Sequence, residues 1–143
     1  MTLSAGDLVG TWRLETCEVI DDESGLQRPF GTKPGGILVY TEAGIMLAAI
    51  MRSDRPRLEA ADLFRATVSE KAAVVDGFLS YGGRYEVVGD RVVHHIDVSL
   101  FPNWIGTTQE RIVLLEGDSL VLEADRGMLG GSRVARLRWS RMS

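Results

Sequence analysis

The sequence contains a single cysteine, Cys17, among its 143 residues. One cysteine cannot form an intrachain disulfide or supply the thiolate cluster of a structural zinc site. We therefore expect Cys17 to be a small packed or surface side chain. We expect neither a metal nor a cofactor in this protein.

Positive charge and long apolar runs are also scarce. The net charge is −4, so the chain lacks a basic stripe that could neutralise a phosphate backbone, and we expect no nucleic-acid partner. The apolar run IMLAAIM at 45–51 is far shorter than the ~20 residues that a membrane-spanning helix requires. The first ten residues show neither the basic nor the apolar part of a secretory signal. These absences predict a cytoplasmic protein with no membrane partner.

The sequence does contain many short segments with period-two hydrophobicity, separated by turns that contain glycine. This pattern is typical of an antiparallel barrel or sandwich, and the length is that of one domain spanning residues 1–143. Thr67 and Glu70 predict a capping box before one short helix within 67–81, which could close one mouth of a barrel. Residues 21–36 predict a long surface loop. The expected strands cover residues 10–20, 36–41, 45–51, 81–88, 91–100, 106–115, 119–125 and 134–141.

Two-residue turns predict which side chains of two hairpins point inward. A turn at Gly89-Asp90 places Tyr85 opposite His94 on the inward face and directs His95 outward. The inward row is then Tyr85, Val87, Val92, His94, Ile96 and Val98. A turn at Gly117-Asp118 pairs Leu115 with Leu120 and directs the following side chains inward: Thr107, Gln109, Arg111, Val113, Leu115, Leu122 and Ala124.

The relation between the two hairpins depends on the connection FPNWIG at 101–106. If inward positions face inward positions, His94 lies opposite Arg111 or one step away, opposite Val113. Tyr85, His94, Arg111 and Ala124 then form one rung across four strands. The small Ala124 side chain leaves space beside the arginine.

The two ends of the chain contain matching motifs. LVGTWRLETCEVID near the N-terminus holds Gly10-x-Trp12, and the chain ends in LRWSRMS. In an up-and-down barrel the first and last strands are antiparallel neighbours, so Arg141 can cover the indole of Trp12. This pairing resembles the Gly-x-Trp and terminal-arginine arrangement of lipocalins and the wider calycin superfamily.

Most of the chain resembles one group more specifically, the lipocalin-like domain family of bacteria and fungi. The stretches that carry the resemblance are LVGTWRL, RPFGTKPGGILVYTEAGIM, MRSDRP, YGGRYEVVGDRVVHHIDVSLFPNWIGTTQERIVLLEGDSLVLEA and LRWSR. The resemblance implies an all-β, antiparallel up-and-down calycin barrel of about eight strands with one short helix. Related barrels include passive carriers of apolar ligands and enzymes that cyclise or isomerise them. The resemblance transfers no catalytic residue to this chain.

His94 is the strongest candidate for chemistry, because the ordinary imidazole pKa of about 6.5 suits a proton shuttle. Tyr85 could orient it or donate a proton, and Arg111 could stabilise an enolate or carboxylate oxygen. Glu18 is a second catalytic candidate if the parity of Trp12 continues along its strand. The alternative is that these buried polar groups form a satisfied structural network.

His95 and the barrel walls have simpler interpretations. Neighbouring strand residues point to opposite faces, so His94 and His95 cannot chelate one metal, and we expect His95 to lie near Asp97 on the surface. Phe101 and Trp104 could plug the barrel end or gate its mouth. Met46 and Ala48 suit an adaptable, roomy wall. The expected ligand contacts are Tyr40, Met46, Ala48, Ile96, Trp104, Gln109 and Ala124.

Three functional hypotheses follow from these residues. In the first, the barrel binds an apolar metabolite, such as a polyketide or terpenoid intermediate, and catalyses its isomerisation, dehydration or cyclisation without a cofactor. In the second, it is a non-catalytic carrier or sensor of a lipophilic small molecule. In the third, it is a solid barrel that acts through its surface, either as a monomer or as a homodimer.

Overall fold

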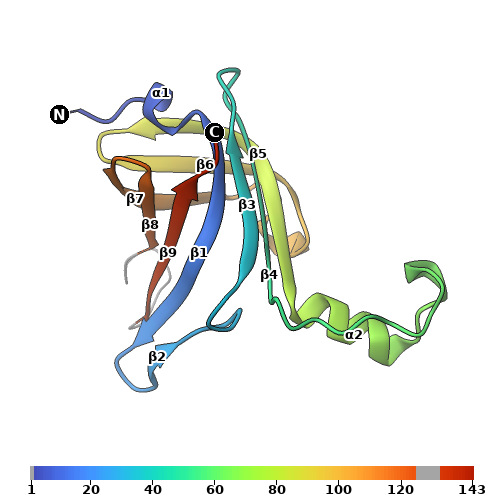
Figure 1. Cartoon of the computed structure of the whole chain (residues 1–143). Helices are drawn as coiled ribbons and strands as arrows, with labels where there is room; N and C mark the ends of the chain where they lie inside the picture. Colours follow the sequence, from blue (N-terminus) through green and yellow to red (C-terminus); the bar gives the residue numbers. More distant parts are fainter. Residues whose placement is uncertain (1, 125–132) are drawn as a thin grey trace.

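The computed structural model describes residues 2–124 and 133–143, and most of these residues belong to one antiparallel β-sheet. The strands follow one another around a closed antiparallel barrel, which the pairing of β1 with β9 completes; short β2 adds to the end of β1 and is not a barrel wall (Figure 1). The predicted barrel of about eight strands is therefore confirmed. The strands are β1 (Gly10–Asp21), β2 (Gly25–Gln27), β3 (Gly35–Tyr40), β4 (Ile45–Met51), β5 (Phe78–Val88), β6 (Arg91–Ser99), β7 (Thr108–Glu116), β8 (Ser119–Ala124) and β9 (Arg133–Arg141).

Short helical segments lie outside the barrel wall. They are α1 (Ala5–Leu8), α2 (Val68–Asp76) and two 3-10 turns, η1 (Leu63–Arg65) and η2 (Pro102–Trp104). The capping box of Thr67 and Glu70 is present at the start of α2. In the described part of the chain, no helix is long and apolar enough to cross a membrane.

The N- and C-terminal segments close one end of the barrel. Trp12 pairs with Arg141 across β1 and β9, and the Arg141 guanidinium lies 4.2 Å from the centre of the Trp12 ring. The same guanidinium donates to the carbonyls of Val9 at 3.1 Å and Asp7 at 3.0 Å. The Trp12 indole donates to the Leu8 carbonyl at 3.0 Å. The predicted Trp12–Arg141 contact is confirmed, and it ties α1 to the last strand.

The hairpin registers also agree with the turn chemistry. Tyr85 pairs with His94, and Leu115 pairs with Leu120. Gly89 and Gly117 have φ angles of 62° and 59°, a left-handed conformation that these tight turns require and that glycine adopts without steric cost.

One part of the predicted inward row is wrong, because β6 contains a β-bulge. Gly82 pairs with Val98 but Gly83 pairs with Ile96, so Asp97 has no opposite residue and the alternation of faces breaks there. Val98 consequently points outward and is 60% exposed. The bulge needs glycine at position 83, since a Cβ there would overlap the His95 carbonyl oxygen and lie 2.9 Å from the Asp97 nitrogen.

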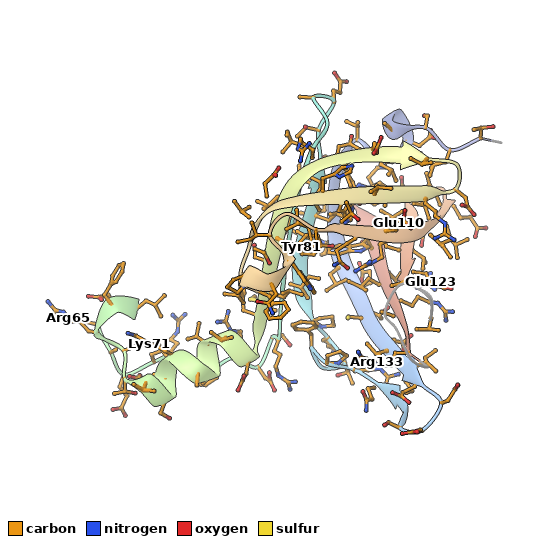
Figure 2. All side chains as sticks on the ribbon, turned by 180° about the vertical axis from the view of Figure 1, so that it is seen from behind. Arg65, Lys71, Tyr81, Glu110, Glu123 and Arg133 are labelled. Carbon is orange, nitrogen blue, oxygen red and sulfur yellow. The ribbon has the colours of Figure 1, made fainter. Side chains whose placement is uncertain are left out.

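The predicted position of the helix is also wrong. Residues 52–77, which include α2, project away from the barrel and do not cover its mouth (Figures 1 and 2). Val68 is 86% exposed, and α2 has no buried residue. The helix packs instead against the segment before it, where the Glu70 carboxylate accepts from the Glu59 amide at 3.1 Å.

Replacing Gly83 by alanine tests the bulge. We expect Gly83→Ala to lower the free energy of unfolding by roughly 3 kcal/mol, because the new methyl group forces the β5 and β6 backbones apart. Urea denaturation measures the change. Gly6→Ala is the matched control, since its Cβ would meet only Ser4 Oγ, at 3.7 Å; equal stability of the two variants would contradict the role of the bulge.

Candidate functional site

His94 lies at the centre of a polar cluster inside the barrel. Its position on β6, set by the Gly89-Asp90 turn, directs the imidazole inward, where it is fully buried. His95 points outward as expected. Its partner is Glu86, at 2.9 Å, and not the predicted Asp97, which pairs with Arg84 at 3.4 Å.

Two tyrosines from opposite sides of His94 hold its ring. The Tyr40 hydroxyl on β3 is 2.7 Å from Nε2, and the Tyr81 hydroxyl on β5 is 3.3 Å from Nδ1. Both phenols are buried. We predicted an inward Tyr40 as a wall residue, but we did not identify Tyr81. Its spacing of four residues from Tyr85 places both on one face of the strand, and that parity could have identified it.

Tyr85 does not contact His94 through its hydroxyl, which corrects the predicted role. Although the two residues pair across the ladder, the Tyr85 hydroxyl donates to the Thr41 carbonyl at 2.7 Å, in the turn between β3 and β4. The Tyr85 ring packs edge-on against Tyr40, with 4.7 Å between ring centres. Tyr85 therefore packs against Tyr40, whose hydroxyl contacts His94.

Arg111 does not share a rung with His94. The register places Gln109 opposite His94 and Arg111 opposite Val92, so neither predicted alignment is correct. The cause is the 100–107 connection, whose backbone extends the pairing: Ile96 donates to the Thr107 carbonyl at 3.0 Å. This pairing sets a register that side-chain alternation alone cannot determine.

Arg111 nevertheless lies on the inward face of β7, because it pairs with the buried Val92, and its charge lowers the pKa of Tyr40, Tyr81 and His94. It donates to the Glu110 carbonyl at 2.7 Å and makes two long contacts of 3.5 Å with Gln109 Oε1. Among residues 2–124 and 133–143, no carboxylate lies within ion-pair distance of this guanidinium. Arg111 and Gln109 are half-buried, whereas His94 is enclosed.

The surroundings of Tyr40, Tyr81 and His94 keep these three side chains uncharged at neutral pH. Burial, followed by the charges of Arg111 and His95, lowers the pKa of His94 from 6.5 to about 3. Burial also raises the pKa of Tyr40 and of Tyr81, although Arg111 acts in the opposite direction. At neutral pH His94 is thus a neutral hydrogen-bonding group. Such a low pKa does not match the near-neutral value that we expected of a proton shuttle.

Glu18 lies outside the cluster, contrary to prediction. The pairing of β1 with β9 shifts between Leu14 and Thr16, and this second bulge places Cys17 on the inward face instead. Glu18 pairs with Arg28 at 3.3 Å. Burial, followed by the charge of Glu18, raises the pKa of Cys17 to about 11, so its thiol is protonated at neutral pH.

Apolar side chains surround the cluster. Trp104 is half-buried at the end of η2, where it packs edge-on against Tyr81 with 5.5 Å between ring centres, and Phe101 packs against it in turn. Whether these residues touch a ligand stays a prediction. Five of the predicted wall residues are buried: Tyr40, Met46, Ala48, Ile96 and Ala124.

The low pKa of His94 predicts a specific loss of stability in acid. Between pH 6.5 and about 3, His94 binds a proton in the unfolded chain but not in the folded protein. This contribution to stability is present above pH 6.5 and is lost as the pH falls through that range. Unfolding measured from pH 7 to pH 4 should show a wild-type loss steeper than that of His94→Gln by roughly 1 kcal/mol per pH unit. An unchanged slope in His94→Gln would refute the assignment.

Comparison with known proteins agrees with this architecture. A sequence profile described as a lipocalin-like domain matches residues 9–142. The 4'-hydroxy-3'-methoxypropiophenone carrier protein of Aspergillus oryzae is 39% identical over 85 residues, which are 54% of this chain and 77% of that protein. The crystal structure of a lipocalin-like protein from Bacteroides uniformis superposes with a TM-score of 0.53 at 14% identity, over 96% of this chain and 100% of the other, and so shows the shared fold. The chain belongs to the lipocalin-like domain family.

Proposed function

We propose that this protein is a non-catalytic carrier that holds a lipophilic small molecule inside its barrel. The observation that carries the proposal is a fixed, uncharged hydrogen-bonding group, Tyr40–His94–Tyr81, set in an apolar interior beside the half-buried Arg111. Sites for small molecules combine mostly apolar walls with a few fixed polar groups that orient the ligand. The interior has this composition.

The two ends of the barrel differ in the length of the connections between strands. The tight turns at 41–44, 89–90 and 117–118 gather at the end that Trp12 and Arg141 close. The longer connections at 22–34, 52–77 and 100–107 join the opposite ends of the strands. A ligand entering there would pass Trp104 before reaching Tyr81 and Arg111.

The relative from Aspergillus oryzae supports both the carrier role and a class of ligand. Its name describes a carrier of an aromatic ketone with hydroxyl and methoxy groups. Among the apolar metabolites that the sequence analysis considered, we therefore favour a small aromatic ketone of polyketide type over a terpenoid.

The catalytic hypothesis has less support than the carrier hypothesis. A base with a pKa of about 3 removes protons poorly at neutral pH, and both nitrogens of His94 already contact tyrosine hydroxyls. Glu18, the other candidate acid or base, points away from the cluster. We therefore assign the cluster to binding and orientation and not to isomerisation, dehydration or cyclisation.

A titration with 4'-hydroxy-3'-methoxypropiophenone tests this proposal. We expect one molecule to bind per chain with a dissociation constant on the order of 1 μM, equivalent to about 8 kcal/mol. Mass spectrometry of the extracted ligand should find it unchanged after prolonged incubation. Absence of binding, or conversion to a product, would contradict the carrier proposal.

Two neighbouring alanines give a matched pair for locating the bound molecule. Ala48 points inward and is buried, whereas Ala49 is on the opposite face of the same strand. Ala48→Leu should weaken binding by roughly tenfold, since it fills interior space, while Ala49→Leu should bind as the wild type does. Circular dichroism checks that both variants fold. Equal affinities in two folded variants would place the ligand outside the barrel.

A further inference from the structure

The Tyr40–His94–Tyr81 group contains more hydrogens than it can use. Each phenol carries one O–H, and a neutral imidazole carries one N–H, which makes three hydrogen-bond donors. Only two contacts join the three side chains, and each contact uses one hydrogen. In either imidazole tautomer, one phenol hydrogen is therefore left without an acceptor inside the group.

The two distances identify which hydrogen is left over. The Tyr40 contact of 2.7 Å lies at the short end for an N–H donor and is typical of an O–H donor, which favours the tautomer in which the Tyr40 hydroxyl donates to Nε2. Nδ1 then carries the imidazole hydrogen and donates to the Tyr81 oxygen over the longer 3.3 Å. The Tyr81 hydroxyl hydrogen remains, and among the described residues no other acceptor lies within hydrogen-bond distance of it.

Other donors in the interior also lack good acceptors. Arg111 has five N–H groups, and among the described residues their acceptors are the Glu110 carbonyl at 2.7 Å and Gln109 Oε1 at 3.5 Å. The Trp139 indole N–H is buried in the same core and has no hydrogen-bond partner in the described part of the chain. In the described part of the chain, the barrel interior therefore holds donors that its own acceptors do not satisfy. A buried donor without an acceptor is costly, and a bound acceptor removes that cost.

We propose that the barrel selects ligands that carry a carbonyl oxygen, which accepts hydrogen bonds from the Tyr81 hydroxyl and the Arg111 guanidinium. The inference rests on the proposed carrier function and adds the chemistry by which the site chooses among lipophilic molecules. A carbonyl oxygen has two lone pairs and no hydrogen, so it can satisfy both donors and adds none.

Propiophenone and propylbenzene form the decisive pair of probes, since they differ only in the carbonyl group. An interior without free donors would favour propylbenzene, because the ketone loses its hydrogen bonds to water on entry. The donor surplus reverses this order. We expect the wild-type protein to bind propiophenone about tenfold more tightly than propylbenzene by calorimetric titration.

Two substitutions test whether Tyr81 and Arg111 cause the preference for the ketone. Tyr81→Phe and Arg111→Met should each weaken propiophenone binding by roughly tenfold and change propylbenzene binding by less than about twofold. Arg91→Met is the control: Arg91 lies on the outer side of β6 and pairs with Glu110 at 3.5 Å, so its replacement should leave the preference unchanged. Infrared spectra of bound propiophenone give a measurement that needs no variant. We expect the C=O stretching frequency of the bound ketone to be lower than in hexane.

Each outcome has a distinct meaning. Tighter binding of propylbenzene, or a bound C=O stretch equal to that in hexane, would overturn the carbonyl inference while the carrier proposal stands. A ketone preference that survives both substitutions would overturn the assignment to Tyr81 and Arg111. Binding of neither probe, together with no binding of the hydroxylated and methoxylated ketone, would overturn both proposals.

Discussion

The hydrogen bond between Tyr40 and His94 is the interaction on which the interior depends. A buried imidazole must either stay neutral or carry a charge that the apolar interior cannot stabilise, and burial next to Arg111 enforces the neutral form. The 2.7 Å contact with Tyr40 then fixes the orientation of the ring. Because Tyr85 packs against Tyr40 and donates to the Thr41 carbonyl, side-chain contacts of the cluster join β3, β5 and β6.

An uncharged imidazole whose two nitrogens both contact tyrosine hydroxyls suits binding better than proton transfer. A carrier needs polar groups that are already oriented before the ligand arrives, because ordering them on binding would reduce the affinity. The two tyrosines orient His94 in this way, and among the described residues the Tyr81 hydroxyl and the remaining Arg111 N–H groups lack a close acceptor. At the closed end, by contrast, the Arg141 guanidinium stacks on Trp12 and donates to two backbone carbonyls.

The sequence was most informative where structure is determined locally. The turns at Gly89 and Gly117 specify two hairpins within a few residues, and the Tyr85–His94 pairing and the inward direction of His94 follow from them. Thr67 and Glu70 likewise identify the start of α2. The pairing of Trp12 with Arg141 could be predicted because barrel closure requires the first and last strands to meet.

The errors arose where alternation is interrupted or where contacts are distant in sequence. Bulges near Glu15 and at Asp97 each reverse the facing of later residues, and neither is visible in a hydrophobic pattern. The contact of His94 with Tyr40 spans 54 positions, so no local rule predicts it. The projection of α2 away from the barrel depends on its packing against residues 52–66, which helical periodicity does not describe.

The protonation state of His94 is the most direct measure of this account. Long-range ¹H–¹⁵N NMR spectra of the free protein at pH 7 distinguish the charged imidazole from its two neutral tautomers. The account predicts a neutral ring with its hydrogen on Nδ1 and an unprotonated Nε2 that accepts from Tyr40. A charged ring, or a hydrogen on Nε2, would contradict it.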